Sequence, residues 1–114
     1  MNKSLIKNAG RASQFLKTLS NEHRLLILCY LVDAERSVSE LEEILELRQP
    51  TLSQQLARLR ADRLVTTRRN GKSIYYSLSS REARALIGVL HKLFCAPRPK
   101  ANARKLRAGA TACR

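Results

Sequence analysis

The amino-acid sequence predicts a mainly α-helical domain that carries one small β-hairpin. Apolar residues recur at helical spacing along most of the chain, whereas residues 64–78 are rich in β-branched and aromatic side chains. Asn70-Gly71-Lys72 divides that second stretch, and Asn-Gly between two such runs is a strong hairpin signal. A chain of 114 residues that is 44% hydrophobic is long enough for one domain with a core.

Two helices are expected before residue 33. The first is indicated by apolar residues that share one helical face, namely Ala12, Phe15, Leu16 and Leu19. Ser20 and Asn21 are good capping residues, so a second helix is expected to follow them and to run through Val32. Its apolar run, residues 25–32, is nearly continuous, which places this helix centrally in the core.

A short helix, a polar-faced helix, the hairpin and a last helix are expected next. Ser37 and Glu40 have the spacing of a capping box, and Pro50 suits the first turn of the fourth helix. The buried side of that fourth helix is formed by Leu52, Leu56 and Leu59. A wide apolar face marks the last helix, which ends near Cys95: Ala83, Leu86, Ile87, Leu90, Leu93 and Phe94. This order of elements is that of a winged helix-turn-helix domain.

The charge of the chain points to an acidic partner. Lys and Arg number 22 against 9 Asp and Glu, a formal net charge of +13. Nucleic acid is the first candidate and an anionic membrane surface the second. The longest apolar run has only eight residues, and the first residues lack the apolar stretch of a signal peptide, so neither a membrane span nor a signal peptide is expected. Three cysteines are an odd count without short repeat spacing, which argues against a secreted disulfide framework, so a cytoplasmic protein is expected.

The polar face of the fourth helix and the hairpin tip are expected to bind DNA. Gln can pair bidentately with adenine and Arg with guanine, each worth about 1–3 kcal/mol of discrimination in the major groove. The basic hairpin suits phosphates or the minor groove. An ordinary solvated surface is the alternative, but this face carries no acid. The expected DNA-binding residues are Gln49, Thr51, Ser53, Gln54, Gln55, Arg58, Arg68, Arg69, Asn70 and Lys72.

Three segments resemble the ArsR/SmtB repressors of bacteria: LSNEHRLLILCYL, QPTLSQQLARLR and VTTRRNGKSIYYSL. The likeness covers roughly residues 9–96. It implies a homodimer joined through the first and last helices, which releases operator DNA when an inducer binds. Ser37-Val38-Ser39 stands where the arsenic and cadmium sensors of the family have Cys-Val-Cys, and Glu82 and His91 lack the paired spacing of the zinc sensors. Neither a metal site nor a cofactor is therefore expected.

Cys29 and Cys95 resemble the cysteine pair of the persulfide-responsive subgroup, of BigR, SqrR and YgaV type. The resemblance implies that a reactive sulfur species links the two thiols within one protomer, so that sulfide-detoxification genes are derepressed. A direct disulfide and a longer polysulfide bridge both remain open. From its place at a helix end, Cys95 is expected to be exposed and to react first, with His91 one turn earlier as its hypothetical activator. Cys113 is interpreted as incidental.

Periodicity alone would make Cys29 a small core residue. The same fold could also use these thiols as a metal or general oxidant sensor. A basic architectural or RNA-associated protein without an inducer is the alternative of another class. No carboxylate pair, Gly-rich phosphate loop or nucleophile–base arrangement indicates an enzyme.

Residues 1–96 are expected to form the DNA-binding and dimerisation domain. Residues 97–114, which carry six bases and no acid, are expected to form a mobile tail.

Overall fold

The computed structural model describes residues 3–95 of the chain. The predicted tail, residues 97–114, lies outside them. The elements in chain order are α1 (Lys3–Leu19), α2 (Glu22–Asp33), β1 (Arg36–Ser37), α3 (Val38–Leu45), α4 (Thr51–Ala61), β2 (Val65–Asn70), β3 (Ser73–Leu78) and α5 (Arg81–Phe94). This is a winged helix-turn-helix fold, mainly helical with a small sheet, as the sequence predicted. Within residues 3–95, no helix is long and apolar enough to cross a membrane.

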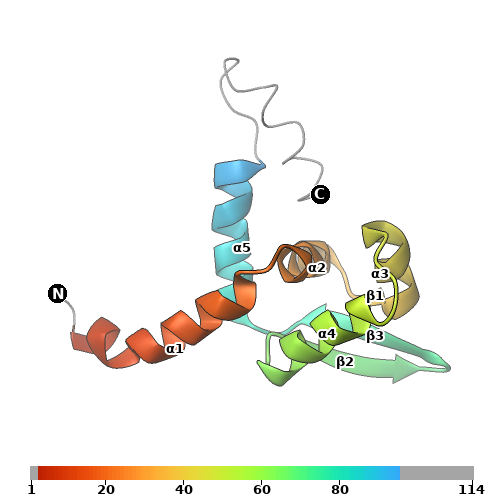
Figure 1. Cartoon of the computed structure of the whole chain (residues 1–114), viewed down its shortest axis with the longest axis horizontal. Coiled ribbons are helices and arrows are strands. Elements are labelled where there is room, and N and C mark those ends of the chain that lie inside the picture. Colours follow the sequence, from red (N-terminus) through yellow and green to blue (C-terminus); the bar gives the residue numbers. More distant parts are fainter. Residues whose placement is uncertain (1–2, 96–114) are drawn as a thin grey trace, which may run out of the picture.

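Helix α2 lies at the centre of the domain. In Figure 1, α1 and α5 project from the body, whereas α3, α4 and the sheet surround α2 on the other side. Ile27, Leu28 and Leu31 of α2 are almost completely buried, which confirms the central place expected from its apolar run. They pack in one cluster with apolar residues of the other elements, including Leu41, Leu52, Leu56, Leu59 and Ile87.

The predicted caps are present at the helix starts. The side chain of Asn21 accepts a hydrogen bond from the backbone N–H of Arg24 at the start of α2. Ser37 and Glu40 form the reciprocal capping box that opens α3. Such caps satisfy backbone donors that have no partner within the helix, so they fix where each helix begins.

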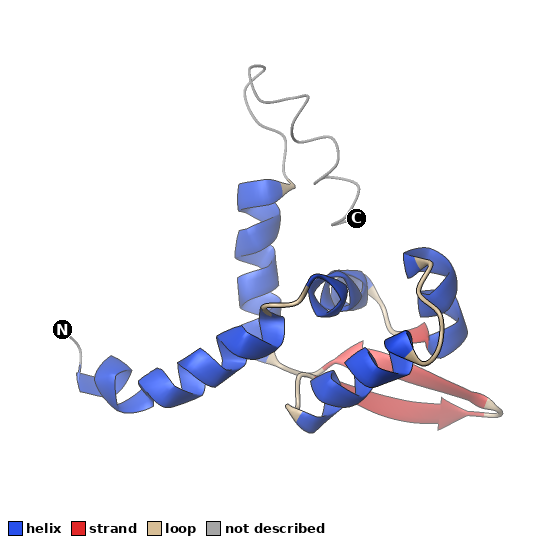
Figure 2. Ribbon diagram, in the orientation of Figure 1, coloured by secondary structure: helices blue, strands red, loops and turns tan. Residues whose placement is uncertain are grey.

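The sheet contains one strand that the sequence did not reveal. Strands β2 and β3 form the predicted antiparallel hairpin, in which Val65 pairs with Leu78 and Asn70 with Ser73. Gly71, with a φ of 67°, opens the tight turn between them. The two residues of β1 pair with the other edge of β3, which gives the strand order β1-β3-β2 (Figure 2). A two-residue strand is too short to produce an alternating pattern.

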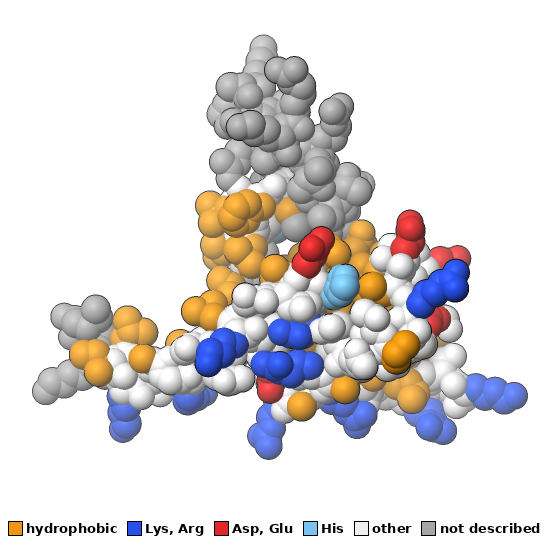
Figure 3. All heavy atoms as spheres, viewed as in Figure 1, with side chains coloured by type: hydrophobic (Ala, Val, Ile, Leu, Met, Phe, Trp, Pro, Cys, Tyr) orange, Lys and Arg blue, Asp and Glu red, His pale blue; other side chains and the backbone are white. Residues whose placement is uncertain are grey.

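Helices α1 and α5 leave large apolar side chains in contact with solvent. Figure 3 shows apolar atoms gathered over α5 and along α1. The exposed residues of these two helices are Leu5, Ile6, Leu16, Val89, Leu93 and Phe94. Exposed apolar side chains that gather on a helix are typical of a surface that associates with another molecule.

Candidate nucleic-acid interface and cysteine pair

Helix α4 presents its polar residues on more than one side. Leu52, Leu56 and Leu59 are buried, as predicted. Ser53 and Gln54 are exposed, whereas Thr51, Gln55 and Arg58 are half-buried. Several of the ten predicted DNA-binding residues already have side-chain partners within the domain, whether they are exposed or half-buried.

The start of α4 is capped by one of the predicted residues. The side-chain Oε1 of Gln49 accepts a hydrogen bond from the backbone N–H of Ser53 at 3.2 Å and another from the Ser53 hydroxyl. This contact satisfies a donor of the first helical turn. Gln49 and Ser53 therefore shape the end of the helix that carries the exposed Gln54.

Arg24 of α2 is a residue that the sequence analysis missed. Its Nη1 donates to Oε1 of Gln55 at 2.9 Å, and its Nε donates to the backbone carbonyl of Thr18 at 2.6 Å. Burial and the neighbouring charge of Arg58 lower the pKa of Arg24, while Asp62 opposes that shift. No local signal pairs Arg24 with Gln55, because the two residues lie 31 positions apart and on different helices.

Arg58 is tied to the end of its own helix. Its Nε lies 2.9 Å from Oδ2 of Asp62, and the same oxygen accepts a hydrogen bond from the hydroxyl of the buried Thr18. The Thr18 hydroxyl, followed by Arg58, lowers the pKa of Asp62. Asp62 therefore joins the end of α1 to the end of α4, and Arg58 is partly neutralised in this arrangement.

The hairpin pairs one exposed basic residue with an acidic partner and carries others at its tip. Arg68 donates from Nε to both carboxylate oxygens of Glu35 at 3.0 Å, and its guanidinium lies 5.1 Å from the centre of the Tyr75 ring. The hydrogen bond and charge of Arg68 lower the pKa of Glu35. Arg69, Asn70 and Lys72 are exposed at or beside the turn.

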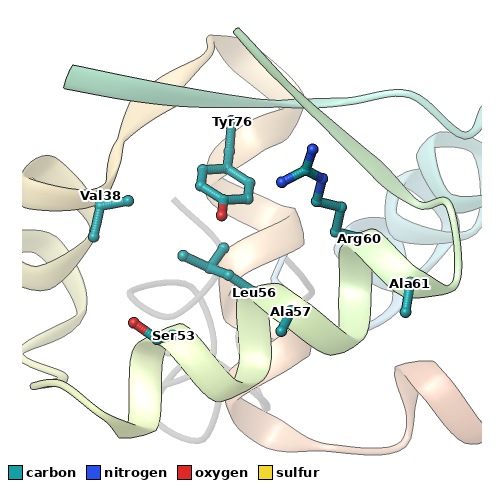
Figure 4. A pocket seen from close by; sticks show the side chains of 7 residues that line it. All are labelled: Val38, Ser53, Leu56, Ala57, Arg60, Ala61 and Tyr76. Atoms are coloured by element: carbon teal, nitrogen blue, oxygen red, sulfur yellow. The ribbon is translucent and has the colours of Figure 1, made fainter. Parts of the chain in front are cut away.

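A hollow separates α4 from the sheet. It has a volume of about 510 Å³, and the side chains of Ser53, Arg60 and Tyr76 are among those that line it. Figure 4 shows Tyr76 directed from β3 toward α4 and Arg60 directed from α4 toward the sheet. Arg60 is exposed and is a second basic residue that the sequence analysis did not select. Its signal was only its place in the basic segment 48–72.

Many of the basic side chains lie along one edge of the molecule. In Figure 3, Lys and Arg atoms follow the lower edge, below α1, α4 and the sheet, opposite the projecting α5. An edge that combines a helix with exposed polar groups and a basic hairpin matches the polyanionic backbone and grooves of duplex DNA.

The two candidate cysteines meet at one pocket, although 66 positions separate them in the chain. Cys29 of α2 and Cys95 at the end of α5 both line a hollow of about 540 Å³. Its walls are mostly apolar, with Leu25, Leu26, Ile87, Leu90 and Phe94 around the two sulfur-bearing side chains. Burial raises the pKa of the Cys29 thiol, which favours its protonated form.

The expectation that Cys95 is exposed is wrong. Its side chain is 6% exposed, because the residue caps the C-terminus of α5 and lines the pocket against α2. Cys95 takes part in a disulfide, whereas Cys29 is a free thiol, so the two are not joined to each other in this structure. His91 is exposed, and its backbone carbonyl accepts the N–H of Cys95. Cys113 lies outside the described residues.

The residues considered as metal ligands stay apart. Ser37 is buried as the cap of α3, while Ser39, Glu82 and His91 are exposed. Among residues 3–95, no three His, Cys, Asp or Glu side chains come together in a way that could hold a metal ion.

Comparisons with known proteins agree with this geometry. Residues 21–67 match the model of the bacterial regulatory proteins of the arsR family. The chain is 52% identical over 89 residues to the transcriptional activator HlyU of Vibrio cholerae, a match covering 78% of this chain and 82% of that protein. The structure of reduced HlyU from Vibrio cholerae has a TM-score of 0.78 at 48% identity, covering 83% of this chain and all of the other. The transcriptional repressor BigR from Xylella fastidiosa has a TM-score of 0.80 at 45% identity and covers 85% of this chain and all of its own.

The fold, the basic edge and these relatives define a DNA-binding transcriptional regulator rather than an enzyme. The chain belongs to the arsR family of bacterial regulatory proteins.

The lowered pKa of Asp62 makes a pH-dependent contribution to stability. A carboxylate whose pKa is depressed by folding stabilises the native state above its unfolded pKa, and that contribution disappears as the pH falls through the folded pKa. We expect Asp62→Asn to lower the free energy of unfolding at pH 7 by about 1 kcal/mol or less, because the pair with Arg58 is partly exposed.

Urea unfolding at several pH values would measure this. The difference between wild type and Asp62→Asn should shrink as the pH falls from about 5 to below about 3. Glu43→Gln, which replaces an exposed acid of α3, is the matched control. A difference that stays constant over this range would contradict the role given to the Asp62 carboxylate.

Proposed function

We propose that this chain is a dimeric transcriptional repressor that releases operator DNA when a reactive sulfur species links Cys29 to Cys95 within one protomer. The observation that carries the proposal is their shared place in the apolar pocket between α2 and α5. The relatives named above include both an activator and a repressor. The proposed sign of regulation follows the resemblance of the cysteine pair to that of BigR.

Dimerisation through α1 and α5 is supported by their exposed apolar residues. Ile6 and Val89 are 64% and 50% exposed. A twofold dimer built on these helices would present two copies of α4 on one side, with a spacing near one turn of DNA, about 34 Å.

Ile6→Glu and Val89→Glu should each weaken the dimer. Burial of such a side chain is worth about 1.5–3 kcal/mol, so each substitution should raise the dimer dissociation constant by at least about tenfold. Sedimentation equilibrium would measure the constant. Ile74→Glu, at an exposed apolar position of the hairpin, is the control and should leave it unchanged. A wild-type chain that sediments as a monomer at micromolar concentration would refute this part of the proposal.

In the DNA complex, the exposed end of α4 would enter the major groove, with Thr51, Ser53 and Gln54 toward it. The hairpin tip would lie on the adjacent backbone or minor groove. Arg69 and Lys72 suit phosphate contacts because both are exposed and neither side chain has a hydrogen bond or ion pair among the described residues. Gln55, Arg58 and Arg68 would bind DNA either after they leave their present partners or while they keep them.

Arg69→Ala and Lys72→Ala should weaken binding to all DNA sequences alike. Each lost phosphate contact reduces the slope of log K against log salt by about 0.9, or about 2 for the two subunits of a dimer. Fluorescence anisotropy over a salt series would measure the slope. Lys92→Ala on α5 removes an equal charge far from the proposed interface and serves as the control. A steep loss at one operator position, with an unchanged slope, would assign these residues to base recognition instead.

The sulfur chemistry starts from the fully reduced protein, in which Cys29 and Cys95 are both thiols. Each cysteine thiolate attacks the outer sulfur of a persulfide RSSH, which gives a cysteine persulfide and releases RSH. The two cysteine persulfides then condense to Cys–S–S–S–Cys with loss of H₂S. A single persulfide attacked by the other thiol gives a disulfide and H₂S instead. In both routes the donor sulfur is reduced and the cysteines are oxidised. The raised pKa of Cys29 suits it to the resolving step.

A bridge would act on DNA binding through α2. It would tie the end of α5, a dimerisation helix, to α2, which packs against α4 and holds Gln55 through Arg24. Any shift of α5 relative to α2 changes how the two copies of α4 lie across the dimer. A coupling of about 1–3 kcal/mol, or roughly 5- to 150-fold in affinity, is typical of such switches.

Fully reduced protein treated with a persulfide should lose operator affinity by that factor, and Cys29→Ser and Cys95→Ser should not. Cys113→Ser is the matched control and should respond like the wild type. Peptide mass spectrometry should find Cys29 and Cys95 in one cross-linked species, and its sulfur count separates a disulfide from a polysulfide. Parallel arms with peroxide and with Zn²⁺ test the oxidant and metal alternatives. Normal release of the double-serine variant would refute the proposed inducer.

A further inference from the structure

The hydrogen bond from Arg24 to Gln55 fixes the orientation of one side-chain amide on α4. Arg24 is anchored at two other points, with Nε on the carbonyl of Thr18 at 2.6 Å and Nη2 on the carbonyl of Lys17 at 3.5 Å. Its Nη1 then lies 2.9 Å from the side chain of Gln55. The guanidinium therefore bridges the end of α1 and the middle of α4.

A guanidinium has donors and no acceptor. Only the oxygen of the Gln55 amide can face it, so the orientation of this amide is decided by chemistry. The amide nitrogen Nε2 must then point away from Arg24. Among residues 3–95, Nε2 has no hydrogen-bond partner. The half-buried Gln55 thus offers two N–H donors and holds its carbonyl toward α2.

We infer that Arg24 is a positioning residue that makes Gln55 a donor, so that Gln55 recognises an acceptor base edge, guanine or thymine, in the operator. The bidentate pair of Gln with adenine requires the amide oxygen and nitrogen to face the base together. Guanine presents two acceptors, O6 and N7, and thymine presents O4, so these edges suit a side chain that offers only N–H donors. Adenine presents its N7 acceptor beside an amino donor, and cytosine presents an amino donor, so each of these edges leaves an amino group without an acceptor. The inference rests on the proposed placement of α4 in the major groove and is independent of the cysteines.

Gln54 provides an internal comparison. It is the same residue type, lies next to Gln55, is exposed, and has no side-chain partner among the described residues. Its amide can turn in either direction and can form the bidentate pair with adenine. The two neighbouring glutamines are therefore expected to prefer different bases, although the sequence gives them the same recognition chemistry.

Selection of binding sites from randomised duplexes, with the reduced full-length dimer, would test the inference. Gln55→Ala should abolish a preference for guanine or thymine at one position of each half-site, a loss of about 5- to 100-fold in discrimination. Arg24→Met should admit adenine at that same position, and Arg24→Lys, which keeps a donor, should retain the wild-type preference. Gln54→Ala should change a different position.

Gln55→Glu covers the case in which Arg24 variants fail to fold. It keeps an acceptor for Arg24 and removes both N–H donors, so it too should abolish the preference at the Gln55 position. The inference is overturned if Gln55 variants leave every position unchanged. It is also overturned if wild type selects adenine at the position Gln55 controls, or if folded Arg24→Met keeps the wild-type preference. A wild-type protein that selects no site at all would instead refute the proposed function.

Discussion

The burial of α2 is the constraint on which the rest of the molecule depends. Ile27, Leu28 and Leu31 are excluded from water, because α1, α3, α4, α5 and β3 all pack against this helix. A buried helix has more than one occupied side. On one side α2 places Cys29 in the pocket shared with the end of α5, and near its start it places Arg24 against α4. The cysteine pair and the proposed reading helix are therefore built on the same rigid element.

Several polar side chains that are proposed to bind DNA also form hydrogen bonds within the protein. Gln49, Gln55 and Arg58 each hold a partner inside the domain, and Arg68 of the hairpin holds Glu35. Contacts of this kind cost little to rearrange where they are solvent-exposed, since surface ion pairs contribute about 0–1 kcal/mol. They nevertheless set the orientation in which a side chain first meets a base or a phosphate. Internal partners thus become part of the specificity of the interface.

The hydrogen bonds that join α1, α2 and α4 also explain how a change near α1 and α5, the helices proposed to form the dimer, could reach α4. Thr18 at the end of α1 contacts Asp62 at the end of α4, and its carbonyl receives Arg24. Packing and hydrogen bonding connect these residues without a break. A movement of α1 or α5 against α2 therefore changes the surroundings of both ends of α4, because close-packed elements do not deform independently.

The sequence by itself determined the order of the helices, the hairpin, the caps at Asn21 and Ser37, and the buried leucines of α4. These follow from short-range rules: periodicity, capping chemistry and turn residues act over a few positions. Only the tertiary structure decided that Cys95 is buried at a pocket that Cys29 also lines, that β1 joins the sheet, and that Arg24 holds Gln55. Each of these joins residues that are distant in the chain. The position of a side chain on its own helix does not reveal what another helix places opposite it.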